Sequence, residues 1–124
     1  MVYLIVFVGG GIGAALRHGF NQFAARLLGT GFPYGTLTVN EVGSLAMGAL
    51  AAYFAFRGEA SQGARLFLTT GVLGGFTTFS AFSLDAVLLY ERGQVGLALT
   101  YVVGSVMISI AALVAGLAVV RALA

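Results

Sequence analysis

The chain has 124 residues, of which 60% are apolar and only 8% are charged, whereas about a quarter of the residues of a soluble domain are charged. The mean hydropathy of +1.02 argues against a water-soluble domain. The lack of cysteine excludes disulfides, thiolate metal sites and thiol catalysis. The formal net charge of +2 comes from arginines scattered singly through apolar sequence, which excludes a nucleic-acid-binding patch.

Four hydrophobic runs predict four membrane-spanning α-helices. A span needs roughly 20 mainly apolar residues to cross about 30 Å of hydrocarbon, so the chain holds four spans with short links in one membrane domain, 1–124. Backbone amides in lipid must be satisfied internally, which favours helices. The first run is apolar from Met1 and continues past Leu16, so we interpret it as a retained helix and not a cleaved signal. The predicted spans are approximately 3–28, 33–56, 65–90 and 95–120.

Arg17 lies well inside the first span. An ionisable group at that depth costs at least about 2.5 to 3.5 kcal/mol on insertion scales, so it requires a reason. Two roles stay open: a structural one, in which Arg17 caps carbonyls of a broken neighbouring helix or reaches to an interface, and one in which it draws anions inward.

The second span carries Asn40 and Glu41. Asn40 either links helices by hydrogen bonds or uses its amide hydrogens to solvate a dehydrated anion. One position along a helix rotates a side chain by about 100°, so we expect Glu41 to point away from the wall that Asn40 lines. It would then lie at an interface between copies or in a vestibule. There it would be protonated, be paired with an arginine, or provide an added control on the movement of anions or protons.

The third span contains a predicted break. Residues 71–80 place three glycines, two threonines and a serine in mid-span, where the helix can open and the hydroxyls can take up freed carbonyls. Close helix packing through small residues is the alternative.

The arginines are nearly balanced between the two sides of the membrane. Four spans place Arg57, Arg65 and Arg121 on one side, with Arg26 and Arg92 on the other. Such a near tie predicts that copies insert both ways, and a protein of mixed orientation can build an antiparallel dual-topology homodimer. A dimer with an oppositely oriented paralogue remains open. Small residues suited to the interface are Gly9, Gly10, Gly11, Gly13, Gly43 and Gly48.

Three motifs, which follow one another along the chain, together resemble those of the Fluc/CrcB fluoride channels. They are the glycines of 9–13 with Leu16-Arg17, G-T-L-T-V-N at 35–40, and G-G-F-T-T-F-S-A-F-S at 74–83. The resemblance spans nearly the whole chain. It implies an antiparallel homodimer with two pores that exports fluoride passively across the plasma or inner membrane of a prokaryote.

The resemblance also implies roles for particular residues. Asn40 matches the pore-facing asparagine, and Phe79 and Phe82 match paired phenylalanines whose positive ring edges face the anions. Gly74 and Thr77 match a broken turn whose backbone carbonyls, from both subunits, hold a structural sodium ion on the dimer axis. The hydroxyls implied for the pore are those of Thr78, Ser80, Ser83, Tyr101, Ser105 and Ser109; for Ser105 and Ser109, bonds to their own helix are the alternative.

Two positions, Ala81 and Glu41, depart from the family pattern, and a third, Asp85, keeps two roles open. Ala81 occupies a place where relatives often have threonine, so one pore hydroxyl is missing. Glu41 replaces a residue that is usually apolar, and we keep a gating or modulatory role open for it. Asp85, one turn past Phe82, is either a solvated charge at a helix end or a gating residue.

Other functions fit the residues less well. A small multidrug-type exporter that exchanges protons for organic cations requires a membrane carboxylate, typically in the first span, and aromatic groups for the cation. The first span has Arg17 and no acid, tryptophan is absent, and only Glu41 favours this function. A scaffolding protein would show no ion flux. An enzyme is not expected, because His18 and four acids provide no nucleophile–base pair or metal cluster.

Overall fold

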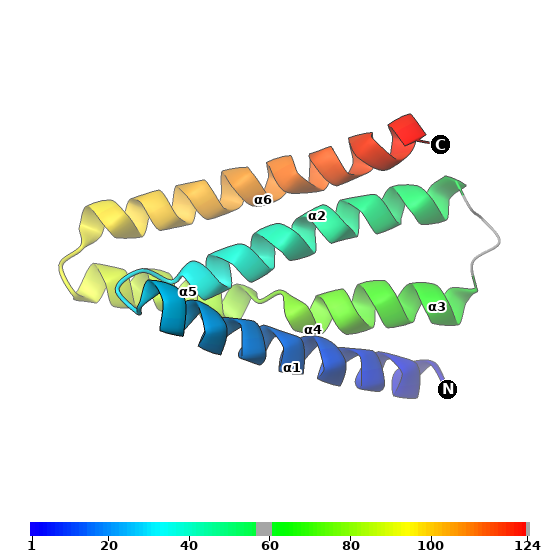
Figure 1. The fold of residues 1–124 in the computed structure, drawn as a ribbon, viewed down its shortest axis with the longest axis horizontal. Coiled ribbons are helices and arrows are strands. Elements are labelled where there is room, and N and C mark those ends of the chain that lie inside the picture. Colours follow the sequence, from blue (N-terminus) through cyan, green and yellow to red (C-terminus); the bar gives the residue numbers. More distant parts are fainter. Residues whose placement is uncertain (57–60, 124) are drawn as a thin grey trace.

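The computed structural model describes residues 1–56 and 61–123, and this part of the chain is all-helical. It contains four helices long and apolar enough to cross a membrane, close to the predicted ranges (Figure 1). Three of them are continuous: α1 (Val2–Leu28), α2 (Tyr34–Phe56) and α6 (Val95–Leu123). The third span consists of α3 (Gln62–Leu66), the π-helical η1 (Phe67–Leu73), α4 (Gly74–Phe76) and α5 (Phe79–Glu91).

The chain reverses direction at each link. The start of α1 and the end of α6 lie at the end of the bundle opposite the α1–α2 and α5–α6 links (Figure 1). Gly29 is the C-cap of α1, and Gly93 follows the Arg92 cap of α5; their φ angles are 78° and 80°, a conformation that favours glycine. The α1–α2 and α5–α6 links therefore lie on one side, as the arginine count assumed, whereas Arg57 and part of the predicted link between the second and third spans lie outside the described residues.

The helices pack in two pairs, α2 along α6 and α1 along the third span (Figure 1). The first pair meets through backbone: a Cβ at Gly48 would lie 3.1 Å from the Leu113 Cα. In the second pair, a Cβ at Gly9 would lie 2.8 Å from the Phe67 carbonyl oxygen. Without side chains at these glycines, the helix backbones approach closely enough for van der Waals contact to hold them.

This packing changes the interpretation of the glycines expected between copies. Gly9 and Gly13 contact the third span, Gly43 contacts Thr77, and Gly48 contacts α6, all within one chain. Gly11, by contrast, is exposed, and a Cβ added there would meet no atom within 4 Å. Most of the glycines expected between two copies therefore pack helices together within one subunit.

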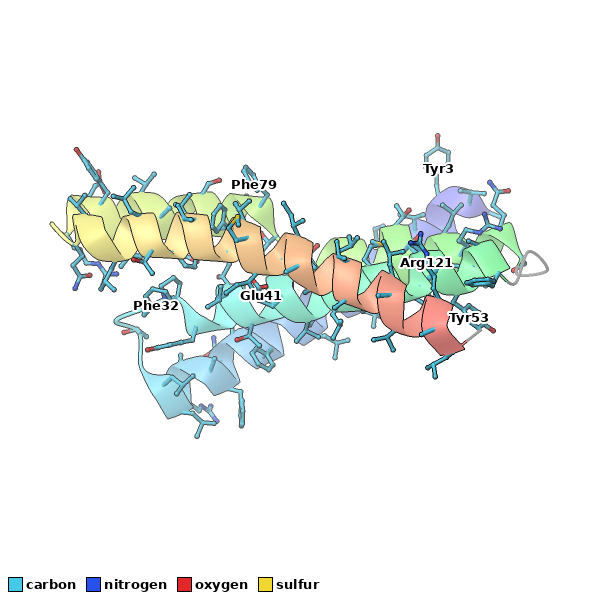
Figure 2. The ribbon with its side chains drawn as sticks, turned by 90° about the horizontal axis from the view of Figure 1, so that it is seen from above. Tyr3, Phe32, Glu41, Tyr53, Phe79 and Arg121 are labelled. Carbon is cyan, nitrogen blue, oxygen red and sulfur yellow. The ribbon has the colours of Figure 1, made fainter. Side chains whose placement is uncertain are left out.

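The interior of the bundle is small, and its surface is apolar. The largest fully buried side chains are those of Tyr101, Leu89 and Val39. Long apolar side chains instead point outward along every span, as Tyr3 and Tyr53 do in Figure 2. Such a surface suits hydrocarbon, and with four apolar spans it makes this chain a multi-pass membrane protein.

Candidate functional site

The third span is broken at Thr77 and Thr78, within the predicted run. Thr77 has φ −87° and ψ 160°, and Thr78 has φ −154° and ψ 123°, so both are extended between α4 and α5. The Thr77 hydroxyl and amide both donate to the Leu73 carbonyl at 3.0 Å, which closes the last turn before the break. The π-helical turns of η1 precede it and already depart from regular α-helical pairing.

Two polar side chains from other spans bond to the opened backbone. The Asn40 Nδ2 donates to the Thr78 carbonyl at 3.0 Å, and the Thr78 N–H donates to Asn40 Oδ1 at 2.8 Å. Asn40 thus pairs with the extended residue much as a neighbouring strand would. Arg17 Nε donates to the Gly75 carbonyl at 3.1 Å, which is the carbonyl-capping arrangement named as one of its two roles.

Because the chain is extended at the break, the carbonyls of Gly74 and Thr77 lose their helical hydrogen-bond donors. In a continuous helix, the N–H groups of Thr78 and Ala81 would bond to the carbonyls of Gly74 and Thr77. Here Thr78 donates to Asn40, and Ala81 donates to the Thr78 Oγ1 at 3.1 Å. Within the described residues, no non-helical backbone bond or side-chain bond reaches either carbonyl oxygen. Carbonyl oxygens of this kind are suitable ligands for a hard cation.

A pocket of about 380 Å³ opens beside the break, between α2, α5 and α6. We call it the Asn40 pocket. Its polar groups are amide and hydroxyl groups, and no charged side chain is among its lining residues. The N-terminal end of α5, capped by the Thr78 hydroxyl, also meets this pocket, and helix N-termini favour anions. The lining includes Asn40, Ser44, Thr77, Thr78, Phe79, Phe82, Ser105 and Ser109.

The two phenylalanines line the Asn40 pocket in different settings. Phe79 is 78% exposed, whereas Phe82 is only 8% exposed. Their ring centroids are 5.6 Å apart with a 46° tilt between the rings. Phe82 also packs on Tyr101, with 5.1 Å between centroids. Phe82 is thus fixed by the core, and Phe79 stands at the edge of the subunit (Figure 2).

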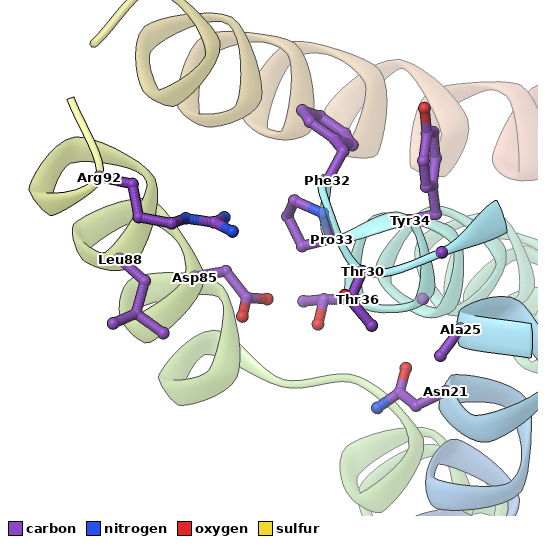
Figure 3. Close-up of a pocket in the computed structure, with 12 residues that line it drawn as sticks. Asn21, Ala25, Thr30, Phe32, Pro33, Tyr34, Thr36, Asp85, Leu88 and Arg92 are labelled. Atoms are coloured by element: carbon purple, nitrogen blue, oxygen red, sulfur yellow. The ribbon is translucent and has the colours of Figure 1, made fainter. Parts of the chain in front are cut away.

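A second pocket, of about 360 Å³, lies near the α1–α2 link, and we call it the Asp85 pocket (Figure 3). Asp85 and Arg92 line one side of it, and Asn21 lines another. The Tyr101 hydroxyl donates to Asp85 Oδ2 at 3.2 Å. The Tyr101 ring contacts Phe82 of the Asn40 pocket and Phe32 of the Asp85 pocket, so an aromatic cluster joins the linings of the two pockets.

The predicted hydroxyls are only partly brought together. Thr78, Ser105 and Ser109 line the Asn40 pocket, whereas Ser80 and Ser83 are not among its lining residues. The Ser80 hydroxyl lies 3.3 Å from that of Thr78, and Ser83 donates to the Phe79 carbonyl of its own helix at 3.0 Å.

Ser105 and Ser109 differ from the expected alternative of bonds to their own helix. Ser109 donates to Glu41 Oε1 at 3.0 Å. The Ser105 Oγ is buried, and it has no hydrogen-bond partner within the described part of the chain. Glu41 is not among the residues that line the Asn40 pocket, in keeping with its expected rotation away from Asn40, but it contacts the pocket through Ser109.

Sequence reasoning missed Asn21 and Phe32. Both line the Asp85 pocket, and the Asn21 Oδ1 is buried with no partner among the residues described. Asn21 is a polar residue inside an apolar span, which is the same signal that drew attention to Asn40. Phe32 stands in a link before Pro33, and no local pattern distinguishes it from other link residues.

Comparison with known proteins gives one family. The family model described as "CrcB-like protein, Camphor Resistance (CrcB)" matches residues 4–117. A protein of Rhodopseudomonas palustris (strain BisB5) named "Fluoride-specific ion channel FluC" is 63% identical over 123 residues, covering 99% of each chain. A Methylobacterium nodulans protein of that name is 61% identical over 95% of this chain and 94% of its own. "Fluoride-specific ion channel FluC 2" of Nitrobacter hamburgensis is 60% identical over 98% of both chains.

Proposed function

The chain belongs to the CrcB family, and on that basis we propose that it is a fluoride-selective channel that lets fluoride leave the cell down its gradient. The observation that carries the proposal is the 63% identity over 99% of the chain to a protein named as a fluoride-specific ion channel. A channel carries out no chemical reaction, so we propose no enzymatic activity. The comparisons give no support to a proton-coupled cation exporter.

The Asn40 pocket has the chemistry that such a channel needs. Fluoride is small and strongly hydrated, so a pore must replace its water with hydrogen-bond donors while binding it weakly enough for release. The pocket offers the Asn40 amide, hydroxyls of Thr78 and Ser105, and phenylalanine rings, without a charge that would trap the ion. Phe82, Tyr101 and Asp85 then connect this pocket with the Asp85 pocket near the α1–α2 link. We propose this route as the fluoride path.

We further propose that two copies associate in antiparallel orientation, each contributing one pore. Gly74, Phe79 and Ser80 are exposed at the break in mid-span, where a single subunit would present polar backbone to lipid. A second copy against this face would cover the break. The near tie in arginines supports opposite insertion of the two copies.

A sodium ion on the dimer axis fits the same face. The Gly74 and Thr77 carbonyls have lost their helical donors to Asn40 and to the Thr78 hydroxyl. Two pairs of such carbonyls, one from each copy, would provide the oxygen ligands that a hard cation prefers. The ion would hold the two breaks together, and no transport step passes through it.

A fluoride electrode tests the transport function. Purified protein is reconstituted in liposomes loaded with fluoride, and a potassium ionophore balances the charge. We expect fluoride release with no proton gradient, and almost no chloride release from matched liposomes. Release that requires a proton gradient, or no release from correctly inserted protein, would overturn the proposal.

Labelling of a single cysteine tests the antiparallel arrangement, because the chain has no cysteine of its own. Gln94→Cys places a thiol in the exposed α5–α6 link. In intact cells, a membrane-impermeant maleimide should label about half of the molecules if both orientations occur. Complete labelling, or labelling only after the cells are opened, would refute dual topology.

A further inference from the structure

Glu41 is the acidic side chain whose role the proposed path does not explain. It lies on α2 beneath α6 (Figure 2). Its Oε1 accepts the Ser109 hydroxyl at 3.0 Å, and its Oε2 is buried without a hydrogen-bond partner in the described chain. Ser109 in turn lines the Asn40 pocket. The carboxyl group is therefore one hydrogen bond away from the proposed fluoride path.

The charge state of Glu41 decides what Ser109 presents to the pocket. A serine hydroxyl has one hydrogen to donate, and a carboxylate accepts but does not donate. While Glu41 is ionised it takes this hydrogen, so Ser109 presents only lone pairs, which repel an anion. A protonated Glu41 donates to the Ser109 oxygen instead, and the serine hydrogen is free to turn into the pocket. Ser105, one turn away on α6, has no partner among the described residues and already has its hydrogen free.

We propose that Glu41 is a positioning residue that sets the direction of the Ser109 hydroxyl, so that protonation of Glu41 adds a fluoride donor to the Asn40 pocket and increases flux. The proposal rests on the proposed fluoride channel function and deepens it. It assigns a control on conduction to a carboxyl group outside the pore lining.

In the described part of the chain, no charged side chain is bonded to the Glu41 carboxyl group. Arg17 of α1 donates to the Gly75 carbonyl, and Tyr101 of α6 donates to Asp85 of α5, so neither is bonded to Glu41. Among the described residues, Ser109 is the only hydrogen-bond partner of the Glu41 carboxyl group. The other titratable residues described on the packed spans are Tyr3, His18, Arg26, Tyr34, Tyr53, Arg65, Tyr90, Glu91, Arg92 and Arg121.

The test is the pH dependence of fluoride efflux from liposomes with equal pH on both sides. A range of about pH 5.5 to 8.5 covers much of the range in which carboxyl groups buried in proteins titrate. Protein-free liposomes at each pH give the leak of hydrogen fluoride through lipid, which is subtracted. Four proteins are compared: the wild type, Glu41→Gln, Ser109→Ala and, as a matched control, Glu91→Gln at the exposed end of α5.

We expect wild-type flux to rise about tenfold from the alkaline to the acidic end, since a hydrogen bond to a charged group changes occupancy by about that factor or more. Glu91→Gln should keep this dependence. Glu41→Gln and Ser109→Ala should each reduce it to less than about twofold, by the same relation. If one of the two fails to form folded protein, the other still decides the outcome.

Three results would count against these ideas in different ways. Wild-type flux that does not vary with pH would overturn the role of Glu41 and leave the fluoride channel intact. A dependence that survives in Ser109→Ala would show that Glu41 acts without Ser109, and would overturn the positioning role. No wild-type flux at any pH would overturn the channel function itself.

Discussion

Gly13 should be among the least replaceable residues of α1, because it faces backbone of the third span. A Cβ at Gly13 would lie 2.8 Å from the Phe76 nitrogen and 2.9 Å from the Val72 carbonyl carbon, well inside van der Waals contact. Neither atom is the end of a flexible side chain, so α1 itself must move. Forcing extra atoms into a packed contact typically costs about 1 to 3 kcal/mol.

Gly13→Ala should therefore lower the thermal unfolding midpoint of the detergent-purified protein by about 4 to 12 °C, using the scaling for domains of this size. Gly19→Ala is the matched control, because Gly19 is on the same helix and a Cβ there meets no atom within 4 Å. It should leave the midpoint unchanged or slightly raised, since alanine favours helix. Circular dichroism measures both. Equal midpoints for the two variants would refute the proposed contact between α1 and the third span.

Four further substitutions test the break and the pocket beside it. Asn40→Ala leaves the Thr78 N–H and carbonyl without their partner, which should lower the free energy of unfolding by about 1 to 3 kcal/mol per group. We expect a lower unfolding midpoint and loss of efflux, and an unchanged midpoint would contradict the pairing. Arg17→Gln keeps a donor for the Gly75 carbonyl but removes the charge, so efflux should persist if capping is its role and should fall sharply if it attracts anions. Phe79→Ile and Phe82→Ile should each abolish or greatly reduce efflux while the dimer persists on size-exclusion chromatography; full efflux with both rings replaced would refute the ring-edge role.

The four spans and the break could be predicted because the membrane imposes their pattern. Lipid requires long apolar helices, so hydropathy alone gave ranges close to those of α1, α2, the third span and α6. The glycine and threonine run at 71–80 marked the place where the helix opens, and the extended residues are Thr77 and Thr78. Asn40 and Arg17 stood out because polar groups in spans need partners.

The partners of these residues could not be predicted in the same way. Which backbone groups Asn40 and Arg17 bond to depends on how α1 and α2 lie against the third span, and a single sequence does not encode this register locally. The glycines show the same limit: composition indicated close packing, but only the fold shows that Gly9 and Gly48 meet their own chain. The bond between Ser109 and Glu41 joins residues 68 positions apart, and no local pattern predicts it.

The most direct measurement is the reversal potential of the protein in a planar bilayer with unequal fluoride concentrations on the two sides, recorded while the chloride concentration on one side is changed. A pathway whose Asn40 pocket is uncharged, and where amide, hydroxyl and ring hydrogens replace the water of a small anion, predicts a current carried by fluoride alone. The reversal potential should then follow the fluoride gradient and ignore changes in chloride. A potential that shifts with the chloride gradient would contradict this selectivity, and with it the proposed role of the Asn40 pocket.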